Sequence, residues 1–196
     1  GRIPGMFKIT AQLDYLTITG DKMPYIREIK EMLAHKLGNQ YSYTVMISYD
    51  EEGSFKKPEN MKVLLQLEDY LGTLSLTKWS GGKARVTSAT SILKEMNRAL
   101  NEGKDSFYTV PEDEYVLAQL MELSSIEMRE DFSDAMDEDF KTTVLNVDMT
   151  QFATEEALAN MESLKAKLAE LFPGAKCTLL GDMIRYSEMS NRIIFG

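Results

Sequence analysis

The sequence is poor in the residues that build disulfides, zinc sites and membrane spans. Its 196 residues include one cysteine and one histidine. Cys177 alone cannot close an internal disulfide, and Cys177 with His35 is too small a set for a Cys/His zinc site. No apolar run approaches the roughly 20 residues that a membrane-spanning helix needs. These absences exclude a disulfide scaffold and a zinc module, and no membrane-spanning helix is expected within these residues.

Basic residues are outnumbered, and the excess acid is concentrated in one segment. The chain has 22 Lys and Arg against 31 Asp and Glu, a formal charge of −9. Between Pro111 and Asp139, eleven acids stand against Arg129 alone, so this segment carries −10 and the remainder +1. A nucleic-acid backbone requires clustered Lys and Arg, and the sequence has no basic stripe with interleaved aromatic residues. Nucleic acid is therefore not an expected partner.

The sequence also lacks the common catalytic motifs. It contains no Gly-x-Ser-x-Gly nucleophile motif and no Gly-x4-Gly-Lys phosphate loop. Cys177 is expected at an interior strand position and is interpreted as a structural thiol, because a catalytic thiol needs a neighbouring base. His35 lies off the apolar stripe of its helix and is interpreted as a solvated residue. We therefore predict no enzyme activity and no catalytic, cofactor-binding or metal-binding residues, and the residues that contact a substrate stay unassigned.

Two features would suit metal ions but are better explained otherwise. The acidic run Asp131–Asp139 offers carboxylates for calcium, but Met136 stands at the sixth position, where an EF-hand loop requires Gly. We interpret the run as a solvated acidic face. The thirteen methionines could bind copper(I), but those in predicted helices mostly lie at or beside apolar positions: Met32, Met61, Met96, Met121, Met161 and Met189. Core packing, or an adaptable lining for hydrophobic ligands, is the preferred interpretation.

Residue periodicity predicts alternating strands and helices along the chain. Residues 1–5, before Met6, are interpreted as a cloning remnant, and 6–40 as an N-terminal extended segment and helix. The elements expected after residue 40 are a strand at 41–49, helices at 58–74 and 91–100 on either side of a short strand at 84–88, an acidic helical connector at 101–140, a strand at 142–149, a helix at 154–173, a strand at 176–180 and a closing helix at 187–195. In the strand at 142–149, alternation predicts one buried face and one polar face, the latter carrying Asn146 and Asp148.

The helices on either side of the connector share one apolar pattern. An offset of 97 residues aligns Asn60, Leu64, Leu67, Leu71 and Leu74 with Ala157, Met161, Leu164, Leu168 and Leu171. One strand-helix-strand unit cannot bury its own sheet face, whereas two units side by side make a four-stranded sheet with both helices on one face. We therefore expect an α+β fold, a ferredoxin-like sandwich of two βαβ repeats at 41–100 and 141–196, joined by the connector at 101–140.

Several short stretches of the chain resemble the extracytoplasmic (porter) loop of RND superfamily exporters, in the branch that includes the MMPL-type and hydrophobe/amphiphile transporters. The likeness covers most of residues 20–196, and Met183 departs from it by standing where that family often has Pro. The stretches that carry it are Gly38-Asn39-Gln40 with the strand Tyr41–Tyr49, the helix Pro58–Leu74, Arg85–Ser88 with Ile92-Leu93 and Asn97, Pro111–Asp113 with Leu117–Leu123, Asp137–Thr143, Leu180–Met183 and Ser190–Gly196.

The resemblance implies an inner-membrane protein with this domain on its periplasmic side. The domain would bind or conduct hydrophobic or amphiphilic small molecules or lipids for a proton-driven exporter. Its partners would be the transmembrane helices of the same transporter chain, which the second repeat would enter beyond Gly196, and further copies in a homo-oligomer. The alternative is a stand-alone ferredoxin-like module for ligand sensing or protein interaction. An acylphosphatase-like enzyme is least favoured, because the loops at 50–57 and 150–153 contain no Arg.

Overall fold

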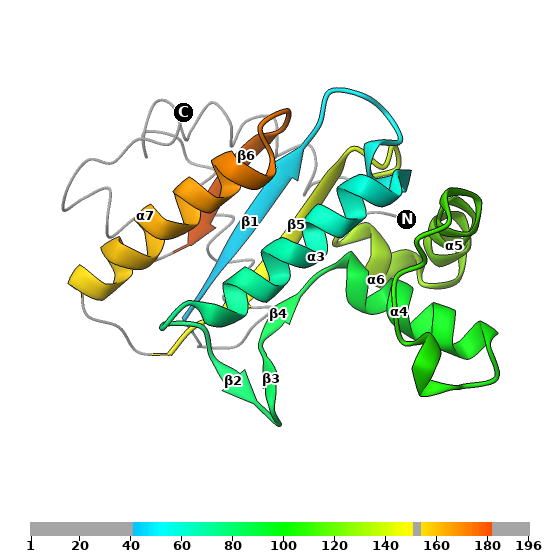
Figure 1. Cartoon of the computed structure of the whole chain (residues 1–196), viewed down its shortest axis with the longest axis horizontal. Helices are drawn as coiled ribbons and strands as arrows, with labels where there is room; N and C mark the ends of the chain where they lie inside the picture. Colours follow the sequence, from blue (N-terminus) through cyan, green and yellow to red (C-terminus); the bar gives the residue numbers. More distant parts are fainter. Residues whose placement is uncertain (1–40, 151–153, 182–196) are drawn as a thin grey trace.

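The computed structural model describes residues 41–150 and 154–181 (Figure 1). The extended segment and helix expected within 6–40, which include His35, and the closing helix expected at 187–195 lie outside these residues. The described elements, in chain order, are β1 (Ser42–Ser48), η1 (Ser54–Lys56), α3 (Pro58–Thr73), β2 (Trp79–Ser80), β3 (Lys83–Ala84), β4 (Val86–Thr87), α4 (Ala89–Leu100), η2 (Asp105–Phe107), α5 (Glu114–Glu127), α6 (Arg129–Ser133), β5 (Thr142–Asp148), α7 (Thr154–Leu171) and β6 (Lys176–Gly181). The fold is mixed α+β.

Four strands form one antiparallel sheet in the order β4-β5-β1-β6. Val45 in the middle of β1 lies opposite Leu145 of β5 on one side and Leu179 of β6 on the other. At the far edge, Val86 of β4 lies opposite Val147 of β5. Each of the two units, β1-α3-β4 and β5-α7-β6, therefore contributes one central strand and one edge strand.

Helices α3 and α7 cover the same face of this sheet (Figure 1). Tyr43, Val45 and Ile47 alternate along β1 and are buried on that face. The apolar stripes of the two helices, whose alignment predicted the duplication, are confirmed as parts of one core: Leu64, Leu67 and Leu71 of α3 and Met161, Leu164 and Leu168 of α7 are all buried in it.

The opposite face of the sheet is also largely buried, and it carries the apolar pair Met46 and Val144 between polar side chains. The Thr44 hydroxyl donates to Asn146 Oδ1 at 2.8 Å, and the hydroxyls of Ser48 and Thr142 share a hydrogen bond at 2.7 Å. Asp148 is only 7% exposed. The expected polar face of β5 is therefore a buried one as well, and hydrogen bonds between neighbouring strands satisfy its side chains.

The strand expected at 84–88 is divided at Arg85. Residues before it form a hairpin, in which Trp79 pairs with Ala84, and residues after it pair with β5. The hairpin turn consists of Gly81 and Gly82, with φ of 59° and 76°. Positive φ at both positions matches the twist of a two-residue hairpin and is free of strain for glycine. The backbone N–H of Arg85 donates to the carbonyl of Lys78, and its side chain pairs with Asp148 at 3.3 Å.

A group of helices lies beside the sheet, in the segment between β4 and β5 (Figure 1). The acidic connector was expected to be helical, and it contains α5 and α6. The inward face of α5 is Leu117, Leu120, Met121 and Ser124. From the sequence, the helical pattern within 114–123 predicted a stripe of Tyr115, Val116, Gln119, Leu120 and Leu123. Leu120 is buried, but the stripe is wrong for the most part, because Tyr115 and Val116 are 70% and 46% exposed and Gln119 is also exposed. Because apolar residues also occupy exposed positions of α5, periodicity alone did not identify its buried side.

We expect Leu64→Ala to lower the free energy of unfolding by about 2–5 kcal/mol, because it leaves a cavity in the core. Leu64 is fully buried between α3 and the sheet. Lys62→Ala, on the exposed side of the same helix, is the matched control, with an expected effect within about 0.5 kcal/mol. Urea unfolding followed by circular dichroism measures both. Equal effects of the two substitutions would contradict the packing described.

Candidate ligand-binding site

A pocket opens at the end of α5, beside α6 and the loop that leads into β5. Its volume is about 400 Å³, within the range of small-molecule sites. The lining comes from one contiguous part of the acidic connector: Glu122, Ser125, Ile126, Arg129, Phe132, Ser133, Met136, Asp137, Glu138 and Phe140. The pocket is therefore formed by the segment between the two strand-helix-strand units.

The floor of the pocket is apolar and its rim is charged. Phe132, Met136 and Phe140 are buried, and the ring centroids of the two phenylalanines lie 6.4 Å apart. Ile126, at the edge, is 64% exposed. The exposed rim bears acidic side chains, among them Glu122, and one cation, Arg129. An apolar floor below charged groups suits a ligand that has both an apolar body and a polar head.

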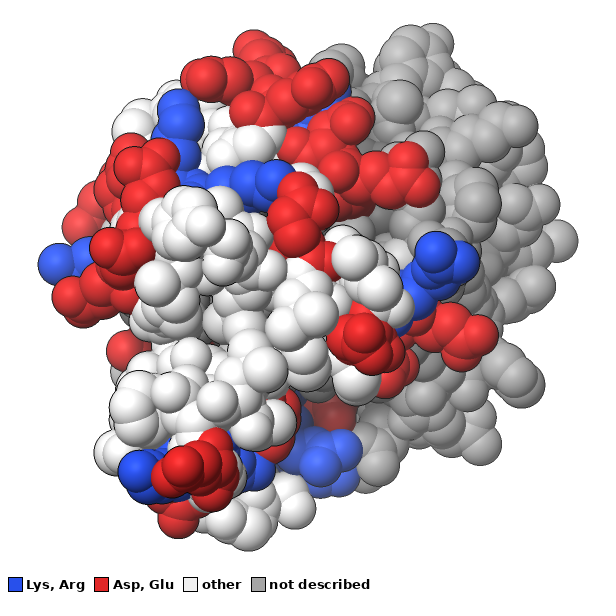
Figure 2. All heavy atoms as spheres, turned by 90° about the vertical axis from the view of Figure 1, so that its right-hand side faces the viewer, with Lys and Arg blue, Asp and Glu red and all other residues white. Residues whose placement is uncertain are grey.

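Figure 2 shows the face of the molecule on which these helices lie. Acidic side chains gather over its upper part, and a band of uncharged side chains lies below them. Exposed acids of this region include Glu127, Glu130 and Asp131. The expected solvated acidic face is confirmed for Asp131, Glu138 and Asp139, which are exposed.

Asp137 is the exception, because it is buried in the turn that shapes the pocket. Its carboxylate accepts hydrogen bonds from the backbone N–H groups of Lys141 and Thr142, both at 2.9 Å. Burial raises the pKa of Asp137, and these two hydrogen bonds oppose the rise. Phe140 closes the turn with φ 54°, a left-handed conformation that is uncommon for a bulky residue. Asp137 thus holds the backbone conformation that presents Phe140.

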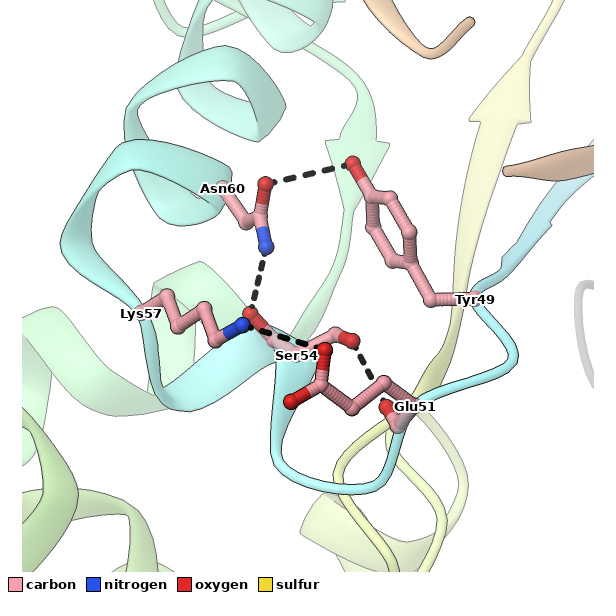
Figure 3. Close-up of polar contacts among 5 residues, drawn as sticks. All are labelled: Tyr49, Glu51, Ser54, Lys57 and Asn60. Carbon is pink, nitrogen blue, oxygen red and sulfur yellow. Dashed lines mark hydrogen bonds and ion pairs between the residues drawn. The ribbon is translucent and has the colours of Figure 1, made fainter. Parts of the chain in front are cut away.

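The loop between β1 and α3 is fixed by a chain of polar contacts (Figure 3). The Tyr49 hydroxyl donates to Asn60 Oδ1 at 3.3 Å, and Asn60 Nδ2 donates to the Ser54 carbonyl at 2.7 Å. The Ser54 hydroxyl donates to the Glu51 carbonyl at 2.6 Å, and the Glu51 carboxylate pairs with Lys57 at 3.3 Å. These contacts tie the loop to the first turn of α3.

The same loop is attached to the pocket segment. The backbone N–H groups of Gly53 and Phe55 donate to the carbonyls of Asp139 and Phe140 at 2.7 and 2.8 Å. The next residue of the loop is Lys56. Its ammonium lies 4.3 Å from the centroid of the Phe140 ring and forms an ion pair with Glu122. Two residues of the pocket lining therefore already stabilise a cation, through a ring face and a carboxylate.

A second carboxylate, Glu68 of α3, is partly buried at the beginning of α4. The Thr90 hydroxyl donates to it at 2.6 Å, and the Ser88 hydroxyl donates to it as well. Ser88 also caps α4 by accepting the backbone N–H of Thr90. Burial raises the pKa of Glu68, and the two hydroxyl hydrogen bonds oppose the rise. Glu68 joins α3 to the N-terminus of α4 and does not line the pocket.

Of the residues considered earlier for nucleophilic or metal chemistry, Cys177 and most of the named methionines lie within the described part of the chain. Cys177 lies on the edge strand β6, where it is partly buried and packs against the hydrophobic core. Burial raises its pKa to about 11, the reverse of thiol activation. Within 41–150 and 154–181, no group of three or more His, Cys, Asp or Glu side chains could hold a metal ion. Met61, Met121 and Met161 are buried in the core.

Sequence reasoning left the pocket residues unassigned. A signal was present, because Phe132, Met136 and Phe140 recur at intervals of four within an otherwise acidic run. No protein-family model matches the chain, and no curated protein is significantly similar to it. None of the described helices is long and apolar enough to span a bilayer.

We expect Glu68→Gln to change the pH dependence of stability. The pKa of Glu68 is raised in the folded protein, so its contribution to stability is fully present below the unfolded-state pKa and is lost as pH rises through the folded-state pKa. The Gln variant should therefore gain stability relative to the original chain between pH 4 and pH 7. Urea unfolding at both pH values measures this gain. Glu59→Gln, an exposed position on the same helix, is the control, and an equal change in both variants would refute the role of burial.

Proposed function

We propose that this chain is the extracytoplasmic porter domain of an RND-type exporter. The observation that carries the proposal is the sheet, in which two strand-helix-strand units each supply one central and one edge strand and place both helices on one face. This arrangement supports a ferredoxin-like sandwich made by duplication. The sequence resemblance to the porter loop of RND exporters implies that such a sandwich acts as a porter domain.

In this proposal the pocket contacts the exported compound. Phe132, Met136 and Phe140 would bind the apolar body, and the charged rim would bind a polar head. The substrate would be a hydrophobic or amphiphilic small molecule or lipid. Proton movement through transmembrane helices of the same chain would drive the export, with this domain on the periplasmic side of the inner membrane and the full-length protein assembled as a homo-oligomer.

The second candidate is a stand-alone ferredoxin-like module that senses a ligand or binds a protein. One observation favours it: the pocket is complete within a single contiguous segment, Glu122–Phe140, and needs no other domain to line it. In that case the ligand would belong to the same class. Its binding would signal the ligand concentration and would not lead to transport.

The parent reading frame distinguishes the two candidates. For a porter domain, we expect it to encode apolar runs of about 20 residues shortly before Phe7 and after Gly196, as membrane-spanning helices on either side require. Sequencing the gene beyond both ends of this chain is the measurement. Polar, globular sequence on both sides would overturn the exporter proposal and leave the ligand-sensing module.

The pocket is tested by titrating the 196-residue chain with dodecyltrimethylammonium below its micellar concentration, using calorimetry. The alkyl chain matches the apolar floor, and the ammonium head matches the carboxylates at the rim. Ile126→Ser removes apolar area at the exposed edge and should weaken binding about three- to tenfold. Tyr115→Ser, at an exposed position of the same helix outside the pocket, should leave binding unchanged. Equal losses in the two variants would place the binding elsewhere.

A further inference from the structure

A basic segment stands out in this acidic protein. Residues 78–98 carry five basic side chains, Lys78, Lys83, Arg85, Lys94 and Arg98, against the single acid Glu95. The segment runs from the hairpin of β2 and β3 through α4. It shares no residue with the pocket lining between Glu122 and Phe140.

Three of these cations converge on one aromatic ring. The Nζ atoms of Lys83 and Lys94 lie 5.6 and 5.8 Å from the centroid of the Tyr108 ring, and the Arg98 guanidinium lies 4.9 Å from it. They come from different elements, Lys83 from β3 and the other two from α4, while Tyr108 directly follows η2. Packing of the hairpin against α4 and the connector therefore builds the cluster.

The position of Tyr108 is fixed from both sides. The Asn97 side chain donates to the carbonyls of Phe107 and Thr109, at 2.9 and 3.0 Å, and so holds the two residues that flank Tyr108. Asn97 is itself buried, and the Tyr108 N–H donates to the Asp105 carbonyl at 3.0 Å. The ring around which the cations gather is thus preorganised rather than carried on a free loop.

Among the described residues, the ion pairs of this cluster involve Arg98. Arg98 pairs with Glu95 at 2.6 Å and with Asp105 at 3.3 Å. Neither Lys83 nor Lys94 forms an ion pair with any residue in the described part of the chain. The Glu68 carboxylate attracts Lys94 without pairing with it, and it accepts the hydroxyls of Ser88 and Thr90. The cations gathered around this ring repel one another, and a bound anion would lower that cost.

We propose that Lys83, Lys94 and Tyr108 form a binding site for a phosphate-type oxyanion. Such an anion has several acceptor oxygens, so it can accept hydrogen bonds from both ammonium groups at once. The Tyr108 hydroxyl, which makes no hydrogen bond to a described residue, supplies a further donor. The group could be a free phosphate or the phosphate of a lipid head, because both present the same oxygens to the site. The proposal is independent of the exporter proposal and concerns a different part of the surface.

Calorimetry with inorganic phosphate, on the full 196-residue chain at constant ionic strength, tests the site. The double variant Lys83→Ala/Lys94→Ala should weaken phosphate binding at least tenfold, and Tyr108→Phe about threefold. The control Lys62→Ala/Lys176→Ala makes the same change in net charge at exposed positions away from the cluster, on α3 and on the opposite sheet edge, and should stay within twofold of the original chain. Circular dichroism checks that each variant is folded. Lys83→Glu, at an exposed hairpin position, replaces the double variant if that one does not fold.

Sedimentation with vesicles separates the two sources of the anion. Binding to phosphatidylglycerol vesicles, but not to phosphatidylcholine vesicles, that is lost in the double variant and kept in the control would identify a lipid head group. Phosphate binding with the same pattern of losses, but without vesicle binding, would identify a free phosphate. The site is refuted if the original chain binds neither inorganic phosphate nor phosphatidylglycerol, or if the control loses as much binding as the double variant.

Discussion

The antiparallel pairing of β1 with β5 is the interaction on which the rest of the structure depends. These are the central strands of the sheet, one from each unit, and Val45 lies opposite Leu145 at their middle. A shift of β1 by one residue would turn Tyr43 and Ile47 away from α3 and α7 and bring Thr44 into the apolar core. The matched polar pairs on the other face therefore reinforce the register that the apolar face selects.

The same register determines where the pocket forms. The β5 strand begins directly after the Asp137–Phe140 turn, and the Thr143 hydroxyl and the Val144 N–H both donate to the Ala135 carbonyl. Met136 and Phe140 are thus held against the beginning of a central strand. On the other side, the loop after β1 is hydrogen-bonded to the carbonyls of Asp139 and Phe140. Both central strands therefore hold the pocket floor, so a ligand there would contact a segment that is tied to both units.

The sequence predicted the helices and strands that are determined by the residue pattern within the element itself. The stripes Leu64–Leu71 and Met161–Leu168 repeat at helical intervals, and β1 is rich in β-branched and aromatic residues, so pattern and propensity agreed there. It did not predict features that depend on distant partners. The division at Arg85 arises because residues on its two sides pair with different strands. The pocket depends on the left-handed conformation of Phe140, which Asp137 stabilises by hydrogen bonds across the turn, and residue spacing does not encode that conformation.

The net charge of the whole chain does not describe the charge at an individual site. At physiological salt, exposed charges are largely screened beyond about 8–10 Å. The field at Tyr108 is therefore set by Lys83, Lys94 and Arg98 together with the carboxylates that pair with Arg98. The field at the pocket is set by its own rim, whatever the net charge of −9. The absence of a basic stripe argues against a long polyanion, which needs many contacts in a row. It does not argue against one small oxyanion, for which two ammonium groups and a hydroxyl are enough when packing brings them to the same ring.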